Sequence, residues 1–247
     1  MSRLLVLQHL ERERPGLFLK LAEERGLSVC TFRLDLGDSL PEICNGDLLL
    51  VLGGPMGIRD IDNANFPWLK DEVALIKKAL DQGVGIIGVC LGSQLLAYAA
   101  GGNIEVLKED VSRQPLAEIG WDNVFSQFFE NSCELTTLLS HPLPVLHWHG
   151  DRIILPKTAR LIASSRRCKE QLFSIGSSAY GIQFHVEIDD EMVDKWITED
   201  KKFISSALGE GGSTILKQQQ QEFGLKTLHS RLEFLNILFD LLNYREF

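Results

Sequence analysis

One stretch decides the fold: Val84-Gly85-Ile86-Ile87-Gly88-Val89-Cys90-Leu91-Gly92-Ser93-Gln94-Leu95-Leu96. Its first half is rich in Val and Ile, which predicts a fully buried strand. Its end predicts a helix, and the Gly-x-Cys-x-Gly junction matches a nucleophile elbow with cysteine in place of serine. Because a helix N-terminus favours a thiolate, the stretch predicts Cys90 as a candidate nucleophile.

The alternative for Cys90 is a purely structural role, because free cysteine is among the most often buried residues. Gly88 and Gly92 argue against that alternative. They flank the cysteine at positions where a tight, strained turn leaves no room for side chains. The choice between a nucleophilic and a structural Cys90 depends on whether the chain also contains a base and oxyanion donors that could lie beside it.

The segments before the elbow alternate between two patterns. Short apolar runs predict strands at residues 4–8, 27–32 and 47–52. Helical spacing, each time followed by a glycine, predicts helices at residues 15–25 and 68–81. This alternation predicts an α/β fold, in which an open, mostly parallel sheet of the flavodoxin-like kind is flanked by helices.

After about residue 104 the pattern changes to strands with short connections, and then to helices. Asp189 begins a helix that runs through Trp196 and carries carboxylates in its first turn. Leucines spaced by threes and fours from Leu225 to Leu242 predict an amphipathic helix, which packs either on its own domain or on a partner. We therefore expect a domain at residues 1–198 and a helical C-terminal extension at residues 199–247. The later strands are expected at residues 117–125, 145–149, 161–165, 170–175 and 179–184.

Composition limits the classes of function. Of 247 residues, 45% are hydrophobic and 24% are charged, as in ordinary globular proteins. The net charge of −9 argues against a broad nucleic-acid face, which would need clustered Lys and Arg. Neither a membrane span nor a signal peptide is predicted, and the scattered cysteines form no CxxC pair. We expect a cytoplasmic protein with neither nucleic-acid nor membrane partners.

A thiol nucleophile needs a base, a group that orients the base, and donors for the oxyanion. His185 and Glu187 are candidates for the first two roles, because residues i and i+2 of a strand point to the same face. The C-terminal ends of parallel strands also meet at one edge of a sheet, where the elbow lies. Taken alone, His185 would instead be assigned as a core or capping histidine.

Gly53-Gly54-Pro55 follows another predicted strand at the same edge. An exposed glycine N–H there, together with the N–H of Leu91, would make a two-donor oxyanion hole. The alternatives are a simple turn or a phosphate loop. A phosphate loop is disfavoured because no Gly-Lys-Ser/Thr follows.

Together these segments resemble the three signatures of class I (triad) glutamine amidotransferases: Gly88-Val89-Cys90-Leu91-Gly92-Ser93-Gln94, Gly53-Gly54-Pro55 and Gly181-Ile182-Gln183-Phe184-His185-Val186-Glu187. His149-Gly150-Asp151 is similar to a segment in the amidotransferase part of GMP synthetase. Glu118-Ile119-Gly120-Trp121 and His147-Trp148 look most like stand-alone members of this kind. The resemblance covers about residues 40–190.

The resemblance implies a role for each matched residue. Cys90 would be the nucleophile, His185 the base and Glu187 its orienter. Gly54 and Leu91 would be the oxyanion donors. The candidates for binding the rest of the substrate are Gln94, His149, Gly150 and Asp151, although His149 could equally be a strand-end histidine bonded to backbone. His9, His141 and His229 are expected to be structural or solvated.

The implied reaction is hydrolysis of the γ-amide of glutamine through a γ-glutamyl thioester, with no metal or organic cofactor. The ammonia would pass to a synthase partner. GMP synthetase itself continues into an ATP-pyrophosphatase domain, which the residues after Trp196 do not resemble, so only the hydrolytic half is expected. The C-terminal helix could also form a homo-oligomer.

Three other functions stay open. The first is a hydrolase of γ-glutamyl peptides or amines that needs no partner and uses the same catalytic residues. The second is a non-catalytic regulatory subunit, against which the intact Cys, His and Glu set argues. The third is a chaperone or deglycase of the DJ-1 type, for which no acidic residue of an early strand is evident opposite the thiol.

Overall fold

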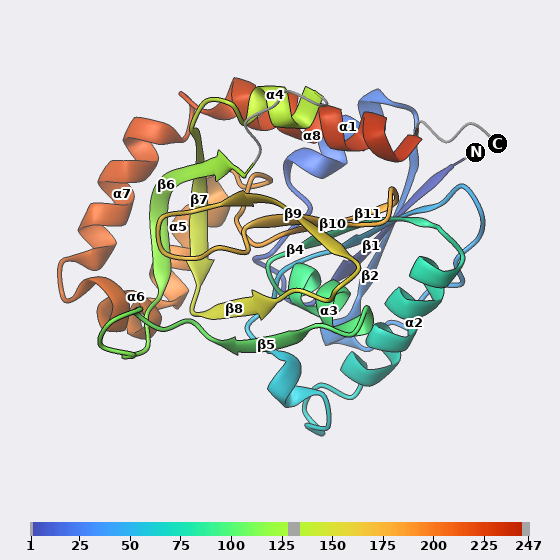
Figure 1. Ribbon diagram of the computed structural model, residues 1–247, viewed down its shortest axis with the longest axis horizontal. Coiled ribbons are helices and arrows are strands. Elements are labelled where there is room, and N and C mark those ends of the chain that lie inside the picture. Colours follow the sequence, from blue (N-terminus) through green and yellow to red (C-terminus); the bar gives the residue numbers. More distant parts are fainter. Residues whose placement is uncertain (1, 128–133, 244–247) are drawn as a thin grey trace.

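The computed structural model describes residues 2–127 and 134–243 of the chain. Within these residues the main sheet has nine strands (Figure 1). These are β1 (Arg3–Gln8), β2 (Ser28–Arg33), β3 (Leu48–Val51), β4 (Gly85–Val89), β6 (Glu118–Ser126), β7 (Leu143–His149), β9 (Ala159–Ser164), β10 (Leu172–Ile175) and β11 (Ala179–Ile182). A separate antiparallel ribbon pairs β5 (Asn103–Val106) with β8 (Asp151–Ile154).

The strands of the main sheet lie in the order β2-β1-β3-β4-β11-β10-β9-β6-β7. The first five run parallel, and from β10 onward each strand is antiparallel to its neighbour. The predicted α/β class and the mostly parallel central sheet are therefore confirmed. Strands β3 and β4 are buried along their whole length, as their continuous apolar sequences predict for strands covered on both faces.

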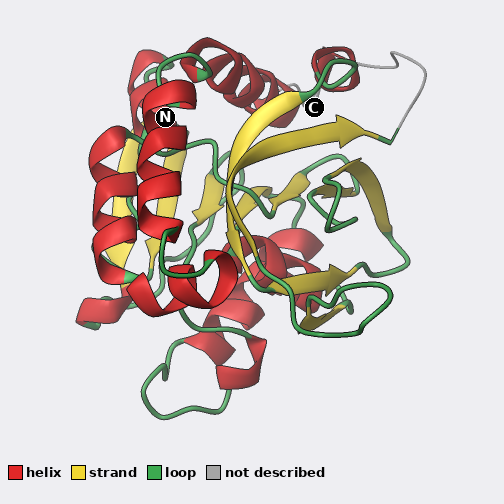
Figure 2. Ribbon diagram, turned by 90° about the vertical axis from the view of Figure 1, so that its left-hand side faces the viewer, coloured by secondary structure: helices red, strands yellow, loops and turns green. Residues whose placement is uncertain are grey.

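Helices cover both faces of this sheet, as the two views in Figures 1 and 2 show. The described helices are α1 (Leu17–Glu24), α2 (Leu69–Asp81), α3 (Leu91–Ala99), α4 (Glu134–Leu138), α5 (Asp190–Glu199), α6 (Lys201–Leu208), α7 (Gly212–Phe223) and α8 (Leu228–Asn243). Side chains of α1 and α8 pack in one core cluster, and those of α2 and α3 pack in a second cluster on the opposite face. None of the described helices is long and apolar enough to cross a membrane.

Helix α8 packs on its own chain. Phe234, Leu235, Leu238 and Phe239 are completely buried in the same cluster as residues of β1 and β3. Leu225, which the leucine spacing placed in this helix, precedes it and is 78% exposed. The division of the chain after residue 198 stays a prediction.

Helices α5, α6 and α7 form a third group beside β6 and β7. Helix α5 begins as predicted, because the Asp189 side chain accepts a hydrogen bond from the Met192 N–H at 2.8 Å. Trp196 of α5 and Trp148 of β7 meet edge to face, with ring centroids 5.5 Å apart. Trp196 also packs on His185, which follows β11, so α5 lies beside the segment that follows the C-terminal end of that strand.

Candidate active site

Cys90 lies at the turn between β4 and α3, with φ 50° and ψ −106°. A positive φ is costly for a residue with a side chain, so the fold must hold this turn firmly. A Cβ added at Gly92 would lie 2.0 Å from the Val51 carbonyl oxygen, and one at Gly88 would lie 2.4 Å from the Gly92 carbonyl oxygen. The flanking glycines are therefore required sterically, as the elbow pattern predicts.

The Cys90 thiol lies at the end of a chain of two glutamine side chains. Gln183 donates its side-chain N–H to Sγ over 3.6 Å, and Gln94 donates to the Gln183 amide oxygen at 3.3 Å. The α3 N-terminus begins at the same residue. Donors and a helix N-terminus both favour a thiolate. Gln94 therefore lies at the elbow as predicted, but its side chain binds Gln183, and it is Gln183 that contacts the thiol.

His185 is buried and held from both sides of its ring. Its Nδ1 lies 2.7 Å from Glu187 Oε1, and Glu187 Oε2 accepts the Val186 N–H at 3.0 Å. Cys90 is a hydrogen-bond partner of the same imidazole. Because Nδ1 is taken by Glu187, Nε2 is the nitrogen left to face the sulfur.

The reason for this placement differs from the predicted one. Strand β11 ends at Ile182, so His185 and Glu187 lie beyond it and their alignment does not come from strand alternation. His185 is instead fixed by an isolated bridge to β7, in which its N–H donates to the Leu146 oxygen at 2.8 Å and its oxygen accepts the Leu146 N–H at 3.3 Å. The edge of Trp196 packs on the imidazole, 4.7 Å between centroids.

Burial by itself lowers the pKa of His185, but its carboxylate and thiol partners reverse the effect. The charge of Glu187 and the hydrogen bonds to Cys90 and Glu187 raise the pKa well above its ordinary value. An imidazolium at Nε2 beside a sulfur favours an ion pair with the thiolate.

Gly54 and Leu91 line the same cavity as the Cys90 thiol. Within the described residues, neither backbone N–H has a hydrogen-bond acceptor. Two unpaired donors beside a nucleophile are what an oxyanion requires. The roles predicted for Gly54 and Leu91 fit this geometry.

The cavity has a volume of about 300 Å³. It gathers the candidates that came from four distant segments of the sequence, and also residues that sequence reasoning did not single out. The predicted site residues in its lining are Gly54, Cys90, Leu91, Gln94, His149, Gly150, Asp151 and His185. Pro55 and Trp148 belong to the matched sequence segments, and the additional residues are Arg12, Glu13, Met56, Trp196, Asp200 and Phe203. Glu187 lies behind His185 and does not line it.

Glu13 is the most notable of the additional residues, because it brings a carboxylate close to the imidazole. A Cβ added at Gly53 would lie 2.0 Å from Glu13 Oε2 and 3.5 Å from His185 Cε1. Burial raises the pKa of Glu13 above its ordinary value, against the opposing charges of His185 and Arg12. The one signal in the sequence was its position in the loop after β1, at the sheet edge where ligands of α/β proteins bind.

The other charged groups around the cavity are paired with each other. Arg12 contacts Glu199 at 3.2 Å and Asp200 at 2.8 Å. Asp151 accepts a hydrogen bond from Arg59 at 3.0 Å. Substrate charges must therefore compete with, or add to, these ion pairs, whereas Glu13 has no ion-pair partner among the described residues.

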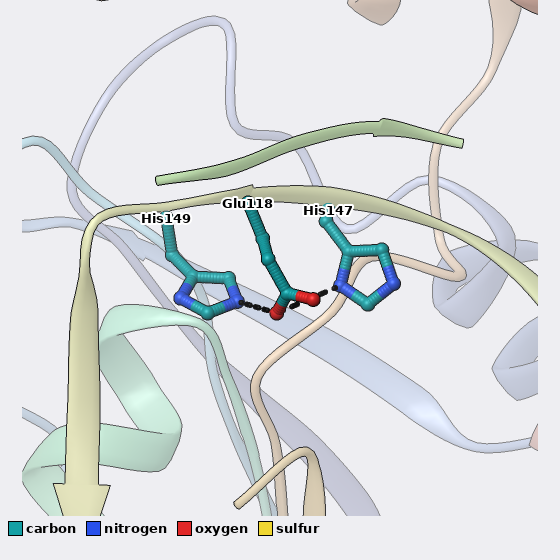
Figure 3. A group of neighbouring side chains, drawn as sticks. All are labelled: Glu118, His147 and His149. Atoms are coloured by element: carbon teal, nitrogen blue, oxygen red, sulfur yellow. Dashed lines mark hydrogen bonds and ion pairs between the residues drawn. The ribbon is translucent and has the colours of Figure 1, made fainter. Parts of the chain in front are cut away.

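His149 forms part of a buried network behind the cavity wall, in which Glu118 lies between His149 and His147 (Figure 3). His149 Nδ1 lies 2.8 Å from the Asp151 carbonyl oxygen, and Nε2 lies 3.1 Å from Glu118 Oε2. A carbonyl oxygen only accepts, so Nδ1 donates to Asp151, whereas Nε2 lies close both to the Glu118 carboxylate and to the Gln171 side-chain nitrogen. His149 thus matches the alternative of a backbone-bonded strand-end histidine while also forming a wall of the cavity.

Glu118, His147 and His149 are residue types that bind metals, and their ligand atoms lie within 4.8 Å of one another. Other side chains nevertheless bind to two of these three residues. The Gln171 side-chain nitrogen lies 2.6 Å from Glu118 Oε2 and 3.2 Å from His149 Nε2. Ser165 also donates to the Glu118 carboxylate. Glu118 and His149 are therefore held in a hydrogen-bonded network, whereas the His147 ring makes no hydrogen bond with the described residues and lies 3.8 Å from the Glu118 carboxylate. This arrangement fits a supporting role behind the cavity.

Comparison with known proteins shows the family to which the chain belongs. The family Glutamine amidotransferase class-I matches residues 18–203. A glutamine amidotransferase-like protein of Salmonella typhimurium, YfeJ, is 32% identical over 204 residues, which is 81% of this chain and 82% of that protein. The crystal structure of a glutamine amidotransferase from Thermotoga maritima superimposes with a TM-score of 0.81 at 26% identity and covers 99% of both chains.

Two shorter matches concern proteins of other functions. A GMP synthase of Clostridium acetobutylicum is 26% identical over 48% of this chain, which spans only 22% of that enzyme's length. Gamma-glutamyl peptidase 3 of Arabidopsis thaliana is 31% identical over 44% of this chain and 43% of its own. With the family match spanning most of the chain, and the elbow and the cavity in place, the chain belongs to the class I glutamine amidotransferases.

Proposed function

We propose that this protein hydrolyses the γ-amide of glutamine through a thioester on Cys90. Family membership supports the amide of glutamine as the bond that is cleaved. The observation that carries the finer assignment is the position of the His185 ring, which lies 2.7 Å from Glu187 on one side and is hydrogen-bonded to Cys90 on the other. A sulfur, an imidazole and a carboxylate in this order form a nucleophilic triad.

The proposed reaction has two steps. The Cys90 thiolate attacks the δ-carbon, a C–S bond forms, and the N–H groups of Gly54 and Leu91 hold the resulting oxyanion. The C–N bond then breaks as His185 gives its Nε2 proton to the departing ammonia. In the second step His185 takes a proton from water, the hydroxide attacks the thioester, and the C–S bond breaks to release glutamate.

An ammonia-accepting synthase is the proposed partner, in line with the GMP synthase match. The second candidate function is hydrolysis of γ-glutamyl peptides or amines without any partner, which the similarity to gamma-glutamyl peptidase 3 favours. Both functions use the same nucleophile, base and oxyanion donors. They differ in the amine that leaves, and therefore in the substrate that is preferred.

The discriminating experiment compares kcat/KM for glutamine with kcat/KM for a panel of γ-glutamyl dipeptides and γ-glutamyl amines, with ammonia and free amine as the products measured. We expect turnover of glutamine with a stoichiometric release of ammonia and glutamate. A strong preference for the peptides would replace the amidotransferase assignment by the peptidase one. No turnover of any member of the panel would favour a regulatory subunit.

A covalent trap tests the nucleophile separately. The diazoketone analogue of glutamine should alkylate Cys90 and leave Cys168 unmodified, because Cys168 lies outside the cavity lining. Peptide mass mapping locates the adduct, and Cys90→Ser is the matched control. A folded wild-type protein that forms no adduct at residue 90 would exclude the thioester route.

A further inference from the structure

His9 and Glu72 form a buried pair directly behind the proposed oxyanion hole. His9 follows the end of β1, and Gly53 lies just beyond the neighbouring parallel strand β3. Leu7 and Val51 are register partners, and His9 and Gly53 each lie two residues further along the chain. His9 Nδ1 lies 2.9 Å from the Gly53 carbonyl oxygen, and His9 Nε2 lies 2.8 Å from Glu72 Oε1. Both side chains are completely buried.

The hydrogen bond to Gly53 acts on the peptide that carries the oxyanion donor. The Gly53 carbonyl and the Gly54 N–H belong to one peptide unit, which is planar and trans. The two groups therefore point in opposite directions. A donor that holds the Gly53 oxygen on the His9 side turns the Gly54 N–H toward the cavity. The same donor polarises the peptide, which makes the Gly54 N–H a stronger hydrogen-bond donor.

The two neighbours of His9 define its charge. A carbonyl oxygen and a carboxylate both accept, so both ring nitrogens must donate and the ring is an imidazolium. Burial alone lowers the pKa of His9, but Glu72 and the Gly53 carbonyl outweigh it and raise the pKa above its ordinary value. Glu72 lies in the first turn of α2, where the helix dipole favours a negative charge.

Stability does not explain this pair. A buried ion pair is often neutral or unfavourable compared with apolar residues of similar volume, because both charges lose their hydration. Close packing alone is also insufficient, since it would not require a charge 2.9 Å from one particular carbonyl oxygen. A role for the pair in the chemistry of the adjacent peptide accounts for both features.

We propose that His9, held by Glu72, is a positioning residue that orients and polarises the Gly53–Gly54 peptide, so that the Gly54 N–H stabilises the oxyanion. This inference rests on the proposed function. His9 touches no substrate in this scheme and acts only through the peptide. It should therefore affect the tetrahedral intermediate and leave ground-state binding of the substrate almost unchanged.

The test uses three variants of the full chain, measured with the panel substrate that the wild type turns over fastest. His9→Leu removes the donor to Gly53. His9→Asn keeps a donor, because the Asn side-chain nitrogen falls at the place of Nδ1. Glu72→Gln keeps a hydrogen-bonding group beside His9 but removes the counter-charge of the imidazolium. The exposed His229→Asn is the matched control.

We expect His9→Leu to lower kcat by roughly 10- to 100-fold at nearly constant KM, below the loss of about 100- to 1000-fold for removing an oxyanion donor outright. His9→Asn should recover most of that loss. The γ-aldehyde analogue of glutamate forms a thiohemiacetal whose oxygen occupies the oxyanion hole, so its affinity should fall in parallel with kcat. This second measurement needs no turnover, which separates the inference from the proposed function.

Two results would overturn the inference. One is an unchanged kcat and aldehyde affinity in folded His9→Leu, and the other is an equal loss in His9→Leu and His9→Asn. If His9→Leu does not fold, Glu72→Gln decides: a lower kcat with a constant KM supports the role, and wild-type kinetics contradict it. A wild type that binds the aldehyde but turns over no substrate would instead count against the proposed function.

Discussion

At the scale of single residues, the geometry around His185 indicates different roles for His185 and Glu187. Glu187 reaches only Nδ1, at 2.7 Å, and does not line the cavity, so it acts on the substrate through the imidazole. In the proposed mechanism, His185 itself transfers the protons. Substitutions of His185 and Glu187 should therefore lower the rate to different extents, even though both side chains are buried.

We expect His185→Ala to lower kcat/KM by about 10⁴-fold or more, and Glu187→Gln to have an effect about 10- to 100-fold smaller. Gln keeps an acceptor for the Nδ1 proton but loses the charge that stabilises the imidazolium. Steady-state kinetics with glutamine measure both losses, and Cys90→Ser sets the background. Equal losses in folded variants would mean that Glu187 takes part in the proton transfers directly.

At the scale of elements, the elbow is a close contact between β3, β4 and α3. A Cβ at residue 92 would meet the Val51 backbone oxygen at 2.0 Å, which cannot move without breaking the pairing of β3 with β4. We expect Gly92→Ala to destabilise the protein by roughly 3 kcal/mol or more. This corresponds to a fall in Tm of roughly 6–12 °C for a chain of this size, measured by calorimetry.

Gly211→Ala is the matched control for the elbow substitution. Gly211 has φ −80°, and a Cβ there would meet no atom within 4 Å. Alanine at such a position leaves stability unchanged or raises it slightly, because the unfolded chain loses freedom. Similar Tm values for the two variants would show that the turn can relax around a side chain at residue 92.

The elements also show which parts of the structure follow from sequence pattern. Continuous apolar runs located β1, β3 and β4, because a strand buried on both faces admits few polar residues. The ribbon strands β5 and β8 were not predicted. Each has four residues, most of them half-exposed or exposed, so neither carries a periodic apolar signal.

The same contrast holds for the site. Cys90 was found because its elbow is a local sequence pattern, and His185 because it belongs to a signature segment. Glu13 lies in an irregular loop, and Gln183 reaches Cys90 across two paired strands, so their contacts depend on how β1, β4 and β11 are arranged. The role of His9 likewise required the neighbouring position of Gly53, which no local pattern contains.

At the scale of the whole molecule, helix α8 is hydrogen-bonded to the segment that contains His185 and Glu187. Arg231 of α8 is buried and donates to the carbonyl oxygens of Val186 at 3.0 Å and Ile188 at 2.7 Å, on either side of Glu187. Burial lowers the pKa of this guanidinium to about 10. The helix therefore completes the core and also binds the backbone on both sides of Glu187, which an amphipathic pattern alone could not reveal.

Stability of the whole molecule should depend on pH through His147, which is buried and has no hydrogen-bond partner at either ring nitrogen. Burial lowers the pKa of His147 to about 4, from an ordinary value of 6.5. Between these two pH values the unfolded chain binds a proton that the folded protein does not. The free energy of unfolding therefore decreases as the pH falls through this range, and a variant without the imidazole should lose that dependence.

We expect His147→Leu to gain stability relative to the wild type as the pH falls below 6.5, by about 1.4 kcal/mol per pH unit and thus about 2 kcal/mol at pH 5. Only the difference between the two proteins isolates this group, because the raised pKa values of His9 and His185 act in the opposite direction. Urea unfolding at pH 7.5 and pH 5 measures it, and the exposed His229→Gln should follow the wild-type profile. A difference that is the same at both pH values would mean that His147 binds its proton equally well in the folded and the unfolded chain.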